Sequence, residues 1–187
     1  MSEHEADLTE TTLHSEAVFD GSFLKVRRDT VRLPNGKKGI REYVRHPGAV
    51  VIIAFADDDR VIMVRQYRYP VQQMIVEFPA GKLDPGEPPL ECAKRELLEE
   101  TGYSAQSWTR VAQMHLAVGY SDEVLHIFVA RGLSEGKRQL DEDEFLHVDV
   151  VPVAEVLEAC RQGAITDAKS LSCILWLQNI HEGRWVV

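Results

Sequence analysis

The chain lacks any long apolar run. No stretch of its 187 residues approaches the roughly 18 consecutive apolar residues that a membrane-spanning helix needs. Its first residues, MSEHEADLTETT, are acidic and lack the basic start and apolar segment of a secretory signal peptide. Its 3 cysteines are too few and too scattered for a disulfide framework. These absences predict a soluble, cytoplasmic protein that does not associate with a membrane.

An excess of positive charge is also missing. Lys and Arg number 21 against 30 Asp and Glu, and the net charge is −9. This argues against a protein that binds nucleic acid by neutralising its phosphates. It does not exclude a small phosphate ester held through a metal ion. The 44% hydrophobic content suffices for a sizeable core.

The N-terminal part has the alternating pattern of β-strands. We expect strands at 15–19, 23–33 and 38–45, separated by turns at Asp-Gly and Pro-Asn-Gly. Residues 1–14 are polar and are expected to be flexible. We expect a hinge at the sequence HPG near residue 46, and we predict a small antiparallel β domain at 1–46 and a larger domain at 47–187.

The larger part mixes strands with helices. Residues 49–56, AVVIIAFA, form a continuous apolar run typical of a strand buried on both faces. Further strands are expected at 60–67, 75–78, 108–116, 123–130 and 147–151, and helices at 90–101, 153–161 and from 167 or 170 to 181. This pattern predicts an α+β fold in which a sheet lies between helices.

A loop rich in glycine and proline leads into the first of these helices, within GKLDPGEPPLECAKRELLEETGY (81–103). Glu96, Glu99 and Glu100 stand at i, i+3 and i+4, so their carboxylates converge on one face of the helix. Like charges this close repel one another. Mg²⁺, which binds carboxylates and substrate phosphates, would offset that repulsion. The alternative is a solvated acidic face held by ion pairs along the helix.

The spacing of this stretch resembles the Nudix box, the signature of hydrolases that act on a nucleoside diphosphate linked to another group. The matching positions are Gly81, Glu87, Arg95-Glu96-Leu97, Glu99-Glu100 and Gly102. Tyr103 stands where the family usually has an aliphatic residue. Outside the box, HPGAVVIIA, VRQYRYP, EFPAGKLDPGE, GYSDE and LDEDEF resemble the ADP-ribose pyrophosphatase branch. The resemblance implies a Nudix α/β/α sandwich, an N-terminal β domain exchanged across a homodimer, and an active site formed from both chains.

The resemblance also implies the metal site and the catalytic groups. The metal ion would be Mg²⁺, with Mn²⁺ as a possible substitute. Its ligands would be the carbonyl oxygen of Ala80 and the carboxylates of Glu96, Glu99, Glu100 and Glu144. The base that activates water would be Glu142, with neighbouring Asp141 and Asp143 as alternatives. Arg95, held by Glu87, would join loop to helix and orient the metal ligands.

Other residues are candidates for binding the substrate. Arginine suits a diphosphate because its planar fork donates two hydrogen bonds to phosphate oxygens, and the resemblance favours Arg68, helped by Arg65. Arg41 and Glu42 match positions that shape the nucleobase and ribose pocket. Gly119 and Glu123 match a loop that contacts the substrate. Ordinary charges on strands remain the alternative for Arg41, Glu42 and Arg65.

The expected reaction is hydrolysis of ADP-ribose to AMP and ribose 5-phosphate. Val118 stands where the branch generally has proline, which leaves other nucleoside diphosphate sugars, such as GDP-mannose and ADP-glucose, open. A non-catalytic nucleotide-sugar sensor is a different class of alternative, and the intact box opposes it. The charge opposes RNA decapping, and 3 cysteines cannot form the four-cysteine zinc site of the branch that cleaves dinucleotide cofactors.

Overall fold

The structure is a computed structural model that describes residues 7–140 and 144–187. It divides into two compact units. The first contains the chain up to His46 together with Ala117–Glu123, and the second contains Pro47–Leu116 and Val124–Val187. In the described part of the chain, no helix has both the length and the apolar character required to cross a membrane.

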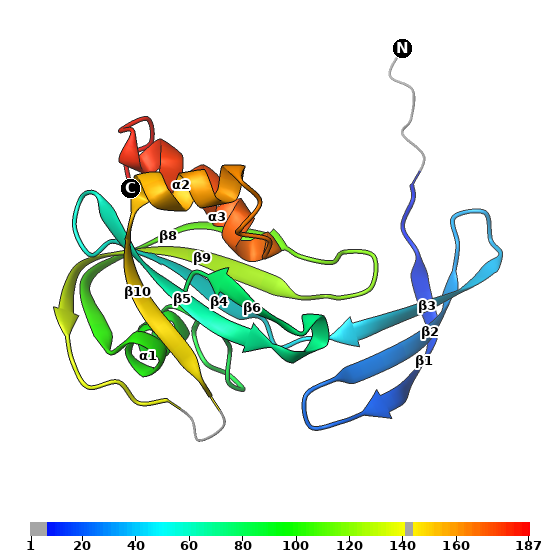
Figure 1. The fold of residues 1–187 in the computed structure, drawn as a ribbon. Coiled ribbons are helices and arrows are strands. Elements are labelled where there is room, and N and C mark those ends of the chain that lie inside the picture. Colours follow the sequence, from blue (N-terminus) through cyan, green and yellow to red (C-terminus); the bar gives the residue numbers. More distant parts are fainter. Residues whose placement is uncertain (1–6, 141–143) are drawn as a thin grey trace, which may run out of the picture. The chain divides into compact units, whose positions relative to one another are not determined.

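The first unit is a three-stranded antiparallel sheet (Figure 1). Its strands, in spatial order, are β1 (Thr11–Asp20), β2 (Lys25–Arg32) and β3 (Lys38–Arg45). Strand β1 begins four residues earlier than the sequence pattern indicated, so part of the stretch expected to be flexible is ordered. The reason is pairing across the sheet, where Thr11 lies opposite Arg32 and Thr12 opposite Val31. The chain then turns at Gly36, which adopts a positive φ of 80°.

The second unit contains two sheets. The four-stranded sheet has the order β7-β4-β9-β8, and the three-stranded sheet has the order β10-β5-β6. The strands are β4 (Ala49–Ala54), β5 (Arg60–Arg68), β6 (Gln73–Glu77), β7 (Ala80–Lys82), β8 (Tyr103–His115), β9 (Val124–Glu135) and β10 (Leu146–Pro152). A short 3-10 helix, η1 (Tyr69–Val71), joins β5 to β6. Strand β4 runs parallel to β9, and the other pairs are antiparallel.

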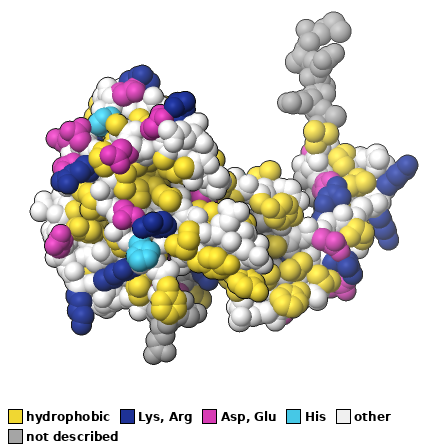
Figure 2. Space-filling view, in the orientation of Figure 1, with side chains coloured by type: hydrophobic (Ala, Val, Ile, Leu, Met, Phe, Trp, Pro, Cys, Tyr) yellow, Lys and Arg dark blue, Asp and Glu magenta, His cyan; other side chains and the backbone are white. Residues whose placement is uncertain are grey.

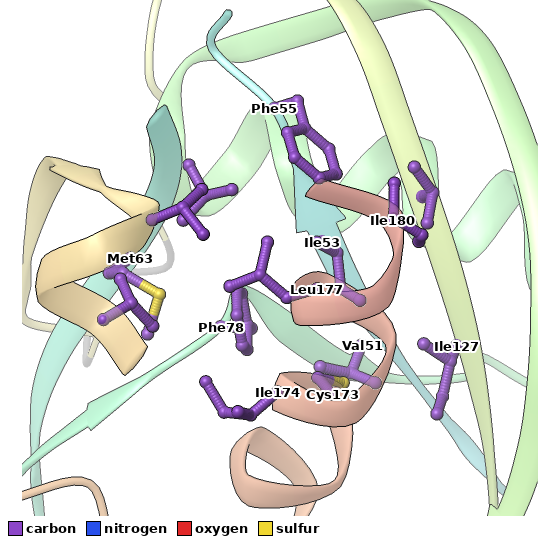
Figure 3. Packing of buried hydrophobic residues seen from close by; sticks show 14 of the residues in the cluster. Val51, Ile53, Phe55, Met63, Phe78, Ile127, Cys173, Ile174, Leu177 and Ile180 are labelled. Atoms are coloured by element: carbon purple, nitrogen blue, oxygen red, sulfur yellow. The ribbon is translucent and has the colours of Figure 1, made fainter. Parts of the chain in front are cut away.

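Strand β4 separates two hydrophobic cores because its side chains alternate between the two faces of the sheet. Its even-numbered residues pack with Cys92, Ala93 and Leu97 of helix α1 (Pro89–Thr101). Its odd-numbered residues pack against α2 (Val153–Arg161) and α3 (Ala168–His181). Figure 3 shows this second core, in which Val51 and Ile53 lie beside the α3 side chains. Helices on both faces confirm the predicted α/β/α sandwich and the α+β class.

Helix ends follow local sequence signals. Pro89 occupies the first turn of α1, where a missing N–H costs nothing, and Gly102 ends the helix with a φ of 78°. Helix α3 begins after Asp167, whose carboxylate accepts a hydrogen bond from the Ser170 amide at 2.9 Å. Pro152 ends β10 and precedes α2. The three helices therefore lie close to the ranges that the sequence predicted.

Candidate active site

Arg95 joins the loop before α1 to the helix itself. Its Nε and Nη2 each donate to one carboxylate oxygen of Glu87, both at 2.9 Å. Nη2 also donates to the carbonyl oxygen of Lys82 at 3.1 Å. This fork holds the pKa of Glu87 down, at about 2, chiefly through the hydrogen bond from Arg95. The predicted partnership of Arg95 and Glu87 is therefore present in the structure.

The same guanidinium lies between two further glutamates. Arg95 Nη1 donates to Glu96 Oε1 and to Glu99 Oε2, each at 2.9 Å. The contact with Glu99 is the i, i+4 pair that helix geometry places side by side. One arginine thus neutralises part of the charge on a face that carries three carboxylates.

Glu100 is the most deeply buried of these acids, with only 3% of its surface exposed. Its Oε2 accepts a hydrogen bond from the Ala80 amide at 3.1 Å. Burial raises the pKa of Glu100 well above its usual range, and the charges of Glu96 and Glu144 add to the effect. Burial likewise raises the pKa of Glu96 to about 7. Both carboxyl groups are therefore poorly stabilised as anions by the protein alone.

Gly81 leaves the space that the Glu96 carboxylate occupies. A Cβ atom built at position 81 would lie 1.8 Å from the Glu96 carboxyl carbon and 1.9 Å from its Oε1. No side chain at position 81 is compatible with this placement of Glu96. The glycine that opens the motif thus makes room for one of its acids.

The two predicted arginines at the end of β5 differ in their surroundings. Arg68 makes a two-point contact with Glu77, from Nε to Oε1 at 2.7 Å and from Nη2 to Oε2 at 2.9 Å. The negative charge of Glu100 contributes to raising the pKa of Arg68, so the Arg68 guanidinium lies near the acidic face of α1. Arg65 faces Asp149 at 3.6 Å, and both side chains are about half exposed. The structure therefore associates Arg68, and not Arg65, with the buried carboxylates.

Sequence reasoning missed Glu77 and Lys169. Glu77 is 2% exposed, and Lys169 at the start of α3 contacts its Oε2. A signal was present, since Glu77 is the lone charge within the apolar run MIVEF. An acid in such a position requires a buried partner. Its partner Lys169 lies 92 residues away in the sequence, so no local pattern pointed to the pair.

The other candidate binding residues all belong to the first unit. Arg41 pairs with Glu10, and Glu42 accepts a hydrogen bond from Arg28 Nε at 2.8 Å. Gly119 and Glu123 lie in the loop 117–123. That loop joins the end of β3 through a parallel bridge between Val44 and Ser121 and through Asp122 Oδ1, which accepts from the His46 amide at 2.8 Å. The structure thus brings these four candidate residues onto one strand and the loop beside it.

Comparison with known proteins identifies the family. The NUDIX domain model matches residues 44–172, and the model of the nucleoside diphosphate sugar hydrolase N-terminal domain matches residues 10–44. The chain belongs to the Nudix family. The predicted resemblance is confirmed, and the protein is a Nudix hydrolase.

Several relatives cover most of this Nudix hydrolase. An ADP-ribose pyrophosphatase of Bacillus subtilis is 44% identical over 91% of this chain and 94% of its own. A methanol dehydrogenase activator of Bacillus methanolicus is 42% identical over 90% and 92%. A GDP-mannose pyrophosphatase of Cronobacter sakazakii is 33% identical over 73% and 75%. The solved structure of an ADP compounds hydrolase has a TM-score of 0.84 and 27% identity, and covers 95% of this chain and 97% of that one.

Nudix hydrolases generally need a divalent metal ion. Across residues 7–140 and 144–187, no three acid, histidine or cysteine side chains are already gathered as a metal site, and Arg95 instead bridges Glu96 and Glu99. The donor chemistry nevertheless fits a hard cation, because carboxylate oxygens are the ligands that Mg²⁺ prefers. The raised pKa values of Glu96 and Glu100 show two acids that a cation would stabilise as anions. The residues present therefore fit the metal.

The acidic loop before β10 is described only at its end. Glu144 lies near enough to raise the pKa values of both Glu96 and Glu100. The predicted base, Glu142, and its alternatives Asp141 and Asp143 lie outside the described residues. Of the acids in this loop, Glu144 is therefore close enough for its charge to act on two carboxylates of the Nudix helix.

Proposed function

We propose that this protein hydrolyses the pyrophosphate bond of nucleoside diphosphate sugars, with ADP-ribose cleaved to AMP and ribose 5-phosphate. The observation that carries the proposal is the buried acid Glu100, which has Glu96 next to it on the helix and interacts with the charge of the Arg68 guanidinium. Acids for a cation and an arginine for phosphate are what a diphosphate requires. The relatives named as ADP-ribose and GDP-mannose pyrophosphatases support this substrate class.

The chain's own residues would divide the work as follows. Glu96, Glu99, Glu100, Glu144 and the carbonyl oxygen of Ala80 would hold Mg²⁺, or Mn²⁺ in its place. When bound, the cation would neutralise part of the diphosphate charge and lower the pKa of a water molecule. Arg68 would donate to the phosphate oxygens and stabilise the charge that develops on them. Arg95 would keep Glu96 and Glu99 in place through the contacts described above.

We assign the general base to Glu142, on the resemblance of LDEDEF to the branch. A carboxylate there would take the proton of the attacking water. Glu144 lies two residues further along the chain, near Glu96 and Glu100, which supports a role for this segment in the reaction. Arg41, Glu42, Gly119 and Glu123 are proposed to contact the nucleoside and sugar, with Arg65 as a further contact to phosphate.

The substrate preference is tested by product chromatography with Mg²⁺. ADP-ribose, ADP-glucose, GDP-mannose, UDP-glucose and NADH are offered in parallel, and we expect ADP-ribose to be cleaved fastest. Comparable rates on several sugars would identify a broad nucleoside diphosphate sugar hydrolase instead. The reason would be relaxed recognition by the loop at Val118, which replaces the usual proline and is 79% exposed. Binding without cleavage of any of them would identify a sensor and overturn the proposal.

In the same assay, Glu142→Gln is expected to slow the reaction at saturating Mg²⁺, because the amide cannot take the proton of the attacking water. An unchanged rate would move the base to a neighbouring acid.

We further propose that two copies associate through the N-terminal sheet. A three-stranded sheet is thin and needs a partner surface. Hydrophobic side chains appear on its surface in Figure 2. Those more than half exposed include Phe19, Phe23 and Ile40. Light scattering should give twice the chain mass of 21.2 kDa. Ile40→Asp should lower that mass while the control Lys38→Asp does not, and a monomeric wild-type protein would overturn the dimer.

The net charge of −9 and three free cysteines support a cytoplasmic enzyme of small molecules that binds neither nucleic acid nor membrane. Cell fractionation tests the location, and recovery with the membrane fraction would contradict it.

A further inference from the structure

Glu77 is a buried acid that lies outside the Nudix motif. It ends strand β6, opposite Val64 of β5, and only 2% of it is exposed. Buried acids are retained at a cost unless cations satisfy them. Glu77 has two such partners, Arg68 and Lys169. They outweigh the effect of burial, so the pKa of Glu77 lies below its usual range and the group is an anion.

The contact between Arg68 and Glu77 runs along the β5-β6 hairpin. Arg68 lies opposite Gln73, four residues before Glu77, and each residue of a strand spans about 3.4 Å. Both side chains are on the same face of the hairpin, because the pairs Val64–Glu77 and Arg68–Gln73 are an even number of residues apart. The Arg68 side chain therefore has to extend back along the strand to reach the acid. Glu77 selects that one conformation from the many open to an arginine.

The fork leaves part of the guanidinium for a ligand. Glu77 engages Nε and Nη2 of Arg68, whereas the second edge of a guanidinium consists of Nη1 with Nη2. The Arg68 side chain is 43% exposed, in contrast to the buried acid. An anion can thus bind to the second edge while the first stays anchored.

Helix α3 in turn holds Glu77. Lys169 contacts Glu77 Oε2 and also Asp167 Oδ2, the latter at 3.0 Å. The backbone amide of Phe78, the next residue, donates to Ser170 Oγ at 3.0 Å. The positive charges of Arg68 and Lys169 are balanced by the negative charges of two acids, Glu77 and Asp167. The group of four side chains is therefore neutral as a whole. The acid that anchors Arg68 is therefore fixed from both its backbone and its side chain.

We propose that Glu77 is a positioning residue that holds the Arg68 guanidinium ready for the substrate diphosphate, with Lys169 as its support. The proposal rests on the function proposed above, in which Arg68 binds the diphosphate. If this is so, Glu77 affects substrate binding only through its contact with Arg68.

A double-mutant cycle on Glu77 and Arg68 tests this. Glu77→Gln turns an amide NH₂ toward Arg68 and Lys169 and breaks the fork. We expect kcat/KM for ADP-ribose to fall by about tenfold, mostly through KM. The affinity for α,β-methylene ADP-ribose, which cannot be cleaved at that bond, should fall by a similar factor in calorimetry. In the Arg68→Ala background, Glu77→Gln should change either quantity less than twofold.

A matched control is available on α2. Glu158 makes a similar contact with Arg161, whose Nε donates to Glu158 Oε2 at 2.7 Å, but the pair is exposed. Glu158→Gln should leave KM unchanged. Lys169→Met keeps the Arg68 fork and serves if Glu77→Gln folds poorly. It should raise KM about threefold, and again only when Arg68 is present.

The outcomes separate the two proposals. A purely structural role for Glu77 would reduce the folded fraction, and hence apparent kcat, equally with and without Arg68. Equal effects of Glu77→Gln in both backgrounds would therefore overturn the positioning role alone. Unchanged KM and analogue affinity in Arg68→Ala would overturn the assignment of Arg68 to the diphosphate, and the role of Glu77 with it.

Discussion

Glu100→Gln should reduce the turnover of nucleoside diphosphate sugars by about a thousandfold while the chain stays folded. The glutamine side chain keeps an oxygen that can accept the hydrogen bond from the backbone N–H of Ala80, so the local structure should be preserved. It removes a negative charge that a cation would use, and metal assistance is worth several kcal/mol, or about three powers of ten in rate. Steady-state kinetics at saturating Mg²⁺ measures the loss, and circular dichroism confirms folding.

A second readout does not depend on catalysis. Addition of Mg²⁺ should raise the melting temperature of the wild-type protein, because a ligand that binds only the folded state stabilises it. The increment should shrink in Glu100→Gln. Glu91, an exposed glutamate on the same helix that pairs with Lys94 at 2.9 Å, provides the control Glu91→Gln. A Glu100→Gln variant with near-normal rate and an intact Mg²⁺ response would refute the metal assignment.

Arg95→Met should lower the free energy of unfolding by about 3 kcal/mol and abolish most of the activity. Methionine fills a similar volume but leaves Glu87, Glu96 and Glu99 without their shared cation. The Arg95 side chain is 29% exposed, so the ion pairs are partly buried, and removing their cation leaves three acids close together without compensation. For a domain of this size, the melting temperature should fall by about 6–12 °C. Thermal unfolding without metal measures the change.

The same substitution should alter the dependence of stability on pH. The pKa of Glu87 is lowered from its ordinary 4.5 to about 2 by Arg95. A lowered pKa contributes stability above pH 4.5, and that contribution is lost as the pH falls from 4.5 to 2. Arg95→Met removes the shift, so its stability should decline less steeply over this interval. Lys94→Met, which removes an exposed neighbour, should keep the wild-type slope, and an equal slope in Arg95→Met would contradict the pairing.

Much of the fold could be predicted because its signals are local. Spacing at i, i+3 and i+4 places Glu96, Glu99 and Glu100 together on any helix, and Pro89 and Gly102 mark where that helix begins and ends. The continuous apolar run of β4 indicated burial on both faces, which the two cores on either side of it confirm. The start of β1 at Thr11 was missed because its first residues are polar and exposed, and only pairing with β2 orders them.

By itself, then, the sequence determined the family, the sandwich of helices and sheet, and the group of acids on one helix, since each depends on periodicity or spacing within a short stretch. Only the tertiary structure decided which charges meet. Lys169 reaches Glu77 across 92 residues, and the loop 117–123 joins the end of β3. The tertiary structure also decided that Glu100 is buried and that its carboxylate accepts a hydrogen bond from the Ala80 amide. The physical reason is that these contacts depend on how distant strands and helices pack, and packing is a property of the whole fold that no local pattern records.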